Sequence, residues 1–148
     1  MTGLKTKKIL SFITDGKLFL ILRNNPKDKR HGGDFWFTVT GEVEKNEDNL
    51  SAVRREVKEE TNLSINEIIP LNWGSQYNIK SNICEEHNYL SFVDNGTIIL
   101  NEEHIDYKWV SITDLIRQIH WLADKSILRK VLEKGIQKEF FFKDLTIE

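Results

Sequence analysis

The chain has 148 residues, of which 39% are hydrophobic and 30% are charged, and its formal net charge at pH 7 is −2. This composition predicts one soluble domain, residues 1–148, with a single hydrophobic core, and the slightly negative charge argues against general nucleic-acid binding. The sequence contains neither a run of apolar residues long enough to span a membrane nor an apolar segment typical of a signal peptide. Because Cys84 is the sole cysteine, an internal disulfide is excluded, and we expect a cytoplasmic protein.

The N-terminal half alternates apolar and polar residues, which predicts strands at 7–14 and 17–23. Asp15–Gly16 between them predicts a two-residue type I′ turn. A polar loop at 24–34 leads to a short strand at 35–40. Apolar residues at helical spacing then predict a helix over 48–61, with Asp48 or Asn46 as its N-cap. Asn62 follows the last turn, where a left-handed residue is common.

The C-terminal half predicts strands at 64–73, 87–93, 97–100 and 107–110, with a tight turn at Asn95–Gly96. A helix begins near Asp114, where Ser111 or Thr113 can cap it, and a second amphipathic helix covers 122–134 and ends at Gly135. Strands on both sides of a central helix, followed by helices, predict an α/β (α+β) fold with a mixed β-sheet sandwiched between α-helices.

Three glutamates of the central helix share one face, because Glu56, Glu59 and Glu60 are spaced i, i+3 and i+4. Like charges at this spacing destabilise a helix. A solvated acidic face would explain the three residues, since surface helices are normally charged. A bound cation would explain them equally well, and clustered carboxylate oxygens suit Mg²⁺ or Mn²⁺.

A longer frame surrounds these glutamates, running from Gly41 to Leu63. It resembles the Nudix box, G-x5-E-x7-R-E-U-x-E-E-x-G-U with U aliphatic, and departs from it only at Asn62. The resemblance implies the Nudix fold and a divalent metal held by the three glutamates and the Gly41 carbonyl oxygen. It also implies that Glu47 and Arg55 pair and join the loop to the helix.

A second informative stretch includes Glu103, His104, Tyr107, Lys108 and Trp109. By itself it is typical of a polar loop that enters a buried strand. It is also similar to E-H-x-x-Y-K/R-W, which recurs in two Nudix groups, the dihydroneopterin triphosphate pyrophosphatases and the diadenosine tetraphosphate hydrolases. That similarity implies Glu103 as a further metal ligand or general base, beside the catalytic candidates Glu56 and Glu59.

Four other residues are candidates for substrate binding. Arg23 and Lys5 carry charges that suit a phosphate, although both also fit a solvated strand. Tyr77 and Tyr89 can stack on a planar ring or pack in the core. The sequence leaves these alternatives open.

The dihydroneopterin triphosphate group is the one that the chain resembles most. Val39-Thr40-Gly41 stands where diadenosine tetraphosphate hydrolases typically carry Pro-Lys-Gly. The resemblance implies hydrolysis of dihydroneopterin triphosphate in folate biosynthesis, or of dATP, to a monophosphate and pyrophosphate. Diadenosine tetraphosphate hydrolysis is the alternative within the family. A non-catalytic nucleotide- or RNA-binding module is the alternative of another class, and the oligomeric state stays open.

Overall fold

The computed structural model describes residues 5–28, 33–79, 82–94 and 96–139, with only the backbone described at 5, 72–79 and 82. The strands are β1 (Lys5–Thr14), β2 (Phe19–Asn24), β3 (Trp36–Phe37), β4 (Val39–Glu42), β5 (Ile65–Ile79), β6 (Asn82–Val93) and β7 (His104–Val110). The helices are α1 (Asn49–Thr61), α2 (Ile112–Gln118) and α3 (Lys125–Ile136). Within the described ranges, no helix has both the length and the apolar character needed to cross a membrane.

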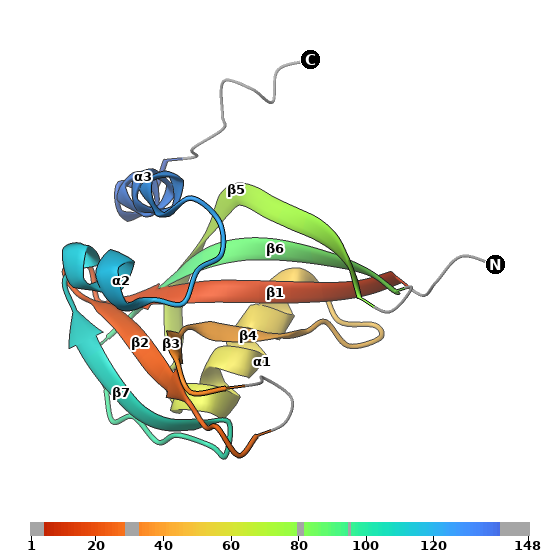
Figure 1. Cartoon of the computed structure of the whole chain (residues 1–148), viewed down its shortest axis with the longest axis horizontal. Helices are drawn as coiled ribbons and strands as arrows, with labels where there is room; N and C mark the ends of the chain where they lie inside the picture. Colours follow the sequence, from red (N-terminus) through yellow and green to blue (C-terminus); the bar gives the residue numbers. More distant parts are fainter. Residues whose placement is uncertain (1–4, 29–32, 80–81, 95, 140–148) are drawn as a thin grey trace.

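Strand β1 is the centre of the mixed sheet (Figure 1). One edge of β1 runs parallel to β6, from the pair Lys5–Ile83 to the pair Thr14–Phe92. Its other edge is shared, because residues 8–11 pair with β4 whereas residues 13–14 pair with β2. Strands β3 and β7 extend the sheet from β2. The sheet therefore divides into two arms on this side of β1, one formed by β4 and the other by β2, β3 and β7.

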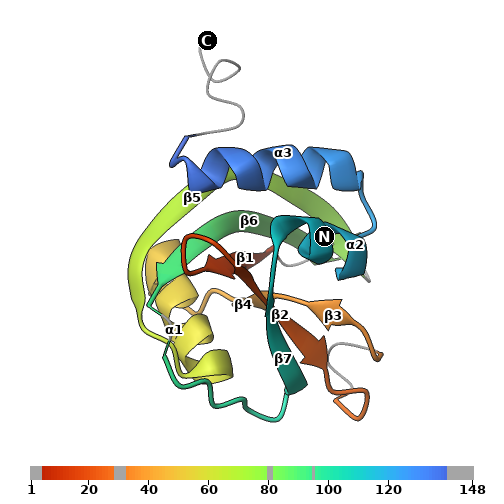
Figure 2. The ribbon, with the colours of Figure 1, turned by 90° about the vertical axis from the view of Figure 1, so that its left-hand side faces the viewer.

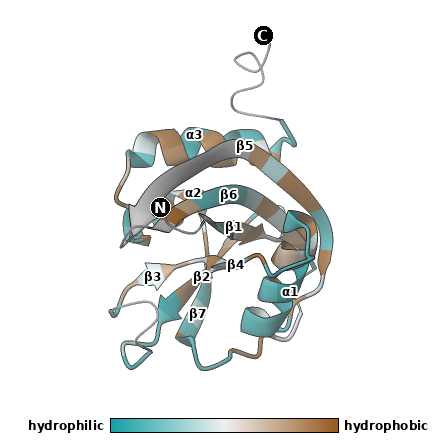
Figure 3. Ribbon diagram, turned by 90° about the vertical axis from the view of Figure 1, so that its right-hand side faces the viewer, coloured by the Kyte–Doolittle hydropathy of each residue, from teal (hydrophilic) through white to brown (hydrophobic). Residues whose placement is uncertain are grey.

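Helices cover both faces of the sheet. Helix α1 packs on one face over a core that includes Ile9, Ile13 and Val57. Helices α2 and α3 pack on the other face over a core that includes Leu10 and Phe12. Figure 2 shows α1 and α3 on opposite sides of β6, and Figure 3 shows hydrophobic and hydrophilic residues alternating along α3. This arrangement confirms the predicted fold class.

The ends of the helices follow the capping signals in the sequence. The Asp48 carboxylate accepts a hydrogen bond from the Ser51 N–H at 2.7 Å, and Ser111 caps α2 in the same way. Asn62 adopts the left-handed conformation, with φ 71° and ψ 3°, and its N–H donates to the Lys58 carbonyl. Asn62 therefore adopts the left-handed backbone conformation that ends the helix, which is the conformation expected of the second glycine of the Nudix box.

The β1–β2 connection differs from the predicted type I′ turn. That turn requires positive φ at both central residues, but Gly16 has φ 104° whereas Asp15 does not have a positive φ. The connection is a four-residue loop, 15–18, because the Asp15 carboxylate accepts hydrogen bonds from the N–H groups of Lys17 and Leu18. A side-chain acceptor thus favoured a wider loop over the tight turn.

Two further predictions in the C-terminal half were wrong. Residues 97–100 form no strand, and the Ile99 N–H instead donates to the Thr61 carbonyl at the end of α1. Gly135 lies inside α3 rather than after it. A Cβ atom at Gly135 would lie 2.8 Å from Leu71 Cδ2 and 3.0 Å from Leu90 Cδ2, so this glycine allows α3 to pack closely on β5 and β6. Of the predicted turn Asn95–Gly96, Asn95 lies outside the described residues.

Candidate active site

A cavity of about 300 Å³ lies between β4, α1 and the start of β7, and we call it the carboxylate cavity. Its lining residues come from four separate segments of the chain: Lys8, Thr40, Gly41, Glu42, Glu56, Glu59 and Glu103. Because the two arms of the sheet diverge at β1, the residue before β7 can face the helix that follows β4. Four carboxylates and one ammonium group therefore line a single small volume.

Gly41 and Glu56 meet at the floor of this cavity. A Cβ atom at Gly41 would lie 1.5 Å from Glu56 Oε2, so any other residue at position 41 would displace the carboxylate. Glu56 is only 8% exposed. Its pKa is raised to about 7, mainly by burial and also by a hydrogen bond with Glu59 and the negative charges of Glu59 and Glu103, whereas the charge of Arg55 lowers it.

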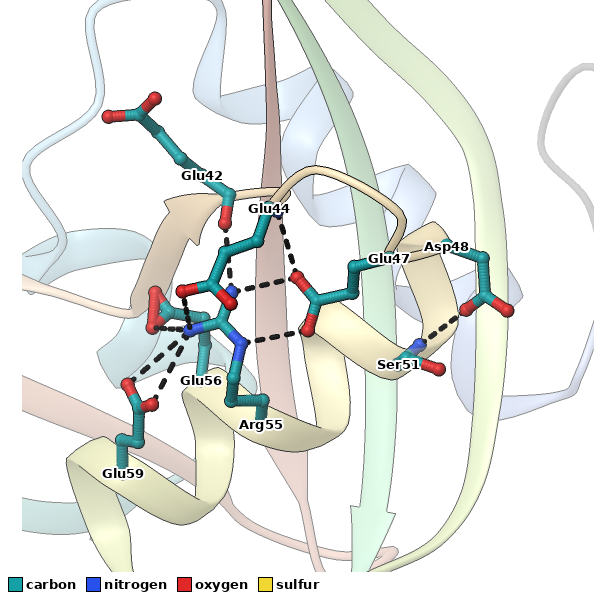
Figure 4. A network of polar contacts seen from close by, with 8 residues as sticks. All are labelled: Glu42, Glu44, Glu47, Asp48, Ser51, Arg55, Glu56 and Glu59. Carbon is teal, nitrogen blue, oxygen red and sulfur yellow. Dashed lines mark hydrogen bonds and ion pairs between the residues drawn. The ribbon is translucent and has the colours of Figure 1, made fainter.

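Arg55 holds the loop after β4 against α1 (Figure 4). Its Nε and Nη2 atoms donate to the two oxygens of Glu47 at 2.8 and 2.9 Å, a bidentate pair. Nη2 also donates to the Glu42 carbonyl at 2.9 Å, and Nη1 donates to Glu56 at 3.1 Å. The Glu47–Arg55 pair that the Nudix resemblance implied is therefore present, and it connects the loop, the helix and the cavity.

This network sets the charge of Glu47. The pKa of Glu47 is lowered to about 2, first by the hydrogen bonds from Arg55 and then by the N–H of Glu44, which donates to Glu47 Oε1 at 2.9 Å. Arg55 in turn has its pKa raised, first by its hydrogen bonds to Glu47. Both groups are fully ionised at neutral pH, so the pair is a permanent connection between loop and helix.

Glu60 is separated from the other two helix glutamates. It is 1% exposed and does not line the carboxylate cavity. Its Oε1 atom lies 3.7 Å from Nδ1 of His104, which is also buried. The three helix glutamates therefore lie in two environments. Glu56 and Glu59 face the cavity, whereas Glu60 faces His104 at the start of β7.

Glu103 reaches the cavity from a locally ordered loop. Its carboxylate accepts a hydrogen bond from Asn101 Nδ2 at 3.0 Å, and its N–H donates to Asn101 Oδ1 at 3.1 Å. Its carbonyl accepts from the Asn25 N–H at 2.9 Å, which ties the loop to the end of β2. The Glu103–His104 pair therefore contributes to two sites, with Glu103 at the cavity and His104 against Glu60.

Of the four substrate-binding candidates, the two with described side chains, Arg23 and Tyr89, do not line this cavity. Arg23 donates two hydrogen bonds to Asp34, from Nε at 2.8 Å and from Nη2 at 2.7 Å. Tyr89 is buried in the core beneath α1, and its hydroxyl accepts from Asn49 Nδ2 at 3.1 Å. The structure thus gives Arg23 an acidic partner and gives Tyr89 a packing position. The side chains of Lys5 and Tyr77 lie outside the described part.

The donor set at the carboxylate cavity suits a hard divalent cation. Carboxylate oxygens dominate its lining, and oxygen ligands are those that Mg²⁺ and Mn²⁺ prefer. The mutual repulsion that helps to raise the Glu56 pKa is the repulsion that a cation relieves. Among the described residues, no three His, Cys, Asp or Glu side chains already stand as a complete metal site. The residues present therefore fit such an ion by their chemistry, and a bound cation would have to draw them together.

Sequence reasoning missed three lining residues, Lys8, Thr40 and Glu42. They are cross-strand neighbours, since Lys8 pairs with Glu42 and Leu10 pairs with Thr40. The alternation along β1 places Lys8 on the face of Leu10, which points to α2 and α3, and this pattern alone does not predict that Lys8 lines the cavity. The pairing of β1 with β4, which brings Lys8 to the site, is a long-range contact.

Comparison with known proteins identifies a family model that matches this chain and several proteins of similar sequence or fold. The family model described as NUDIX domain matches residues 5–131. The dihydroneopterin triphosphate diphosphatase of Haemophilus influenzae is 29% identical over 113 residues, which cover 67% of this chain and 72% of that protein.

Two solved structures illustrate the similarity of fold. The E. coli dihydroneopterin triphosphate pyrophosphohydrolase has a TM-score of 0.64 and 24% identity, with 88% of this chain and 94% of that chain covered. A C. elegans Ap4A hydrolase in a binary complex has a TM-score of 0.66 and 23% identity, with 90% and 98% covered.

Proposed function

This chain belongs to the NUDIX family of hydrolases, and we propose that it uses a divalent cation at the carboxylate cavity to hydrolyse a diphosphate linkage in a nucleoside triphosphate-like substrate. The cation is Mg²⁺ in this proposal, with Mn²⁺ as a substitute. The reaction class follows from the family, whereas the metal and the substrate are inferences from the cavity and from the relatives.

One observation carries the proposal, the convergence of Glu56, Glu59 and Glu103 on one cavity beside Gly41. The close approach of Glu56 to the Gly41 backbone leaves no room for a side chain there. A packing role alone would not require the buried carboxylate of Glu56 to lie near two further carboxylates, because that repulsion costs stability. Such an arrangement is expected where a bound cation and a phosphate group restore the balance of charge.

The cation would be held by Glu56, Glu59, Glu60 and Glu103 with the Gly41 carbonyl oxygen, and Glu60 would join from its buried position beside His104. When bound, such an ion neutralises phosphate charge and makes a water molecule more acidic. Arg55 keeps Glu56 and Glu59 in place through its hydrogen bonds to both. Lys8, which also lines the cavity, supplies a positive charge for phosphate oxygens.

The reaction itself needs a proton acceptor and room for in-line attack. A water oxygen forms a bond to phosphorus, the bond from that phosphorus to the bridging oxygen breaks, and pyrophosphate leaves. The proton of the water passes to a cavity carboxylate, for which Glu56, Glu59 and Glu103 are the candidates. The positive charge of Lys8 stabilises the charge that develops on the leaving pyrophosphate.

The substrate that we favour is dihydroneopterin triphosphate, which would make this an enzyme of folate biosynthesis acting in the cytoplasm. The 29% identical relative carries that activity in its name, and one of the similar structures does so as well. The stretch with Glu103, His104, Tyr107 and Trp109 supports the same group. Hydrolysis of dATP is the related possibility.

Diadenosine tetraphosphate hydrolysis is a second candidate. The Ap4A hydrolase neighbour and the same stretch from Glu103 to Trp109 favour it. A non-catalytic nucleotide- or RNA-binding role is a third, which the complete set of box glutamates disfavours.

A substrate panel tests the proposal directly. Purified protein is assayed for phosphate and pyrophosphate release from dihydroneopterin triphosphate, dATP, GTP, diadenosine tetraphosphate, ADP-ribose and 5′-triphosphate RNA. Each substrate is tested with Mg²⁺, with Mn²⁺ and with excess chelator. We expect pyrophosphate from dihydroneopterin triphosphate with either ion and none with chelator. Release that persists in chelator would overturn the metal mechanism, and no release from any substrate would favour the non-catalytic role.

A further inference from the structure

A second cavity, of about 400 Å³, opens on the face of the sheet that carries α2 and α3. Its walls include Phe37, His120 and Trp121, and Leu10 lies at its floor, so we call it the aromatic cavity. The rings of Phe37 and Trp121 lie 6.2 Å apart at an interplanar angle of 33°. A wall of this kind favours a flat, polarisable ligand, because aromatic rings stack or pack edge-on with one another.

One acidic side chain, Glu86 on β6, lines this otherwise largely apolar cavity. Burial raises the pKa of Glu86, and the positive charge of Lys8 opposes that shift. No hydrogen bond or ion pair to its carboxylate is found within the part of the chain that the structure describes. A half-buried carboxylate with unused acceptor capacity is costly to the fold and is suited to donors on a ligand.

A second polar group lies on the same face of β6. Asn88 follows Glu86 by two positions, so both side chains leave the strand on one side, and Asn88 pairs across the sheet with Leu10 of the cavity floor. Asn88 is 6% exposed, and its Oδ1 atom has no hydrogen-bond partner among the described residues. Two polar side chains with unused hydrogen-bonding capacity thus occur next to each other beside an aromatic wall.

The aromatic cavity is one strand away from the carboxylate cavity. Lys8 stands between them, since it pairs with Glu86 on β6 and with Glu42 on β4. Because neighbouring strands are ~4.8 Å apart, Glu86 and Glu42 are separated by ~10 Å across the sheet. That span suits a ligand whose ring lies in one cavity while its phosphates reach the other, with Lys8 beneath the connection.

We propose that Glu86 selects the ring of the substrate by accepting hydrogen bonds from a ring N–H and an adjacent exocyclic amino group. The ring class is the 2-amino-4-oxo-pyrimidine edge shared by pterins and guanine, which presents two neighbouring donors to a carboxylate. Adenine presents an acceptor nitrogen beside its amino group, and that nitrogen would face a carboxylate oxygen unfavourably. This inference rests on the proposed function, and it favours dihydroneopterin triphosphate and guanine nucleotides over dATP.

The Glu86→Gln variant makes the inference testable, because an amide offers one donor and one acceptor, the pattern that matches adenine. Binding of guanosine monophosphate, adenosine monophosphate and neopterin is measured by titration calorimetry in excess chelator. We expect the wild type to prefer the guanine and pterin rings. We expect the guanine-to-adenine affinity ratio to fall about 10- to 100-fold in Glu86→Gln, the effect of one lost bidentate contact.

Glu85→Gln is the matched control. Glu85 is the neighbouring glutamate on the same strand, its side chain leaves the other face, and its carboxylate contacts His87 Nε2 at 2.8 Å. We expect this variant to keep the wild-type ratio, and thermal melts of both variants check that the fold is intact. A wild-type protein without preference for the guanine or pterin ring would overturn the proposal, as would an unchanged ratio in Glu86→Gln.

These binding measurements do not depend on hydrolysis, because the monophosphates lack a diphosphate linkage. A protein that distinguishes the rings through Glu86 but hydrolyses none of the panel contradicts the proposed function alone. A protein that hydrolyses the panel but binds the rings equally in both variants contradicts only the role of Glu86.

Discussion

The carboxylate cavity and the aromatic cavity are built in different ways. Most of the first comes from the short span from Thr40 to Glu59, in which Arg55 ties loop and helix together with hydrogen bonds. The second combines β1, the strand with Phe37, β6 and the segment around Trp121. The carboxylate of Glu86 in its lining and Oδ1 of the neighbouring Asn88 have no hydrogen-bond partner among the described residues.

We propose that the carboxylate cavity carries out the chemistry and that the aromatic cavity recognises the substrate ring. In our proposal, hydrogen bonds from Arg55 orient Glu56 and Glu59 for phosphate chemistry, and a bound cation completes the arrangement. The polar groups of the aromatic cavity keep their hydrogen-bonding capacity for a ligand. Variants at the first cavity should therefore lower the rate for every substrate, whereas variants at the second should change which substrate is preferred.

The largest expected effect is on the rate in Glu56→Gln. Loss of this charged ligand should remove about 4 kcal/mol of transition-state stabilisation, so kcat falls about a thousandfold for every substrate. The melting temperature should stay the same or rise, because the repulsion with Glu59 and Glu103 is relieved. Steady-state kinetics measure the rate, with exposed Glu133→Gln on α3 as the control. Activity within about tenfold of wild type would contradict a role in catalysis.

The next largest effect should come from Gly41→Ala. The new Cβ would lie 1.5 Å from Glu56 Oε2, so the carboxylate has to move, and a misplacement of about 1 Å costs about a hundredfold in rate. We also expect a loss of about 1–3 kcal/mol in the free energy of unfolding from overpacking. Gly96→Ala is the control, since a Cβ there meets Leu63 Cδ2 at an ordinary 3.5 Å. Equal activity in the two alanine variants would show that Glu56 does not need its observed position.

A smaller, pH-dependent effect is expected for Glu47→Gln. The folded protein lowers the pKa of Glu47 from 4.5 to about 2. The stabilisation by ionised Glu47 is therefore complete above the unfolded pKa and is lost as the pH falls towards 2. Denaturant unfolding should show a wild-type advantage at about pH 6 that shrinks steadily between about pH 4.5 and pH 2. An advantage that is constant across this range would mean that the Arg55 contact does not stabilise the fold.

The smallest effect concerns Asn62. Its left-handed conformation suits glycine, so Asn62→Gly should stay within about 0.5 kcal/mol of the wild-type free energy of unfolding. Asn62→Ala should lose about 1 kcal/mol, because a Cβ-bearing residue without a helpful polar group is disfavoured there. Denaturant titrations measure both. A large loss of activity in Asn62→Gly would reveal a role beyond the helix end, for example through the Asn62–Thr97 hydrogen bond.

The fold was largely predictable where local signals agree with tertiary contacts. The helix α1, its Asp48 cap and its Asn62 end follow from side-chain chemistry within a few residues. Gly135 shows the opposite case, because a glycine near a helix end predicts a C-cap, yet here it serves the contact of α3 with Leu71 and Leu90. The strand predicted at 97–100 fails for a similar reason, since the Ile99 N–H bonds to the end of α1 instead of to a neighbouring strand.

The candidate site also has a part that the sequence predicts and a part that depends on tertiary contacts. The sequence alone identified the family and the box from Gly41 to Leu63, because the box is a continuous local pattern. The Glu47–Arg55 pair was implied by the resemblance to the Nudix family, and the structure contains it. Only the tertiary structure separated Glu60 from Glu56 and Glu59, brought Lys8 to the site and left Glu86 facing an aromatic wall. Those positions depend on which strands pair with β1 and in which register, and such long-range pairing cannot be read from local sequence order.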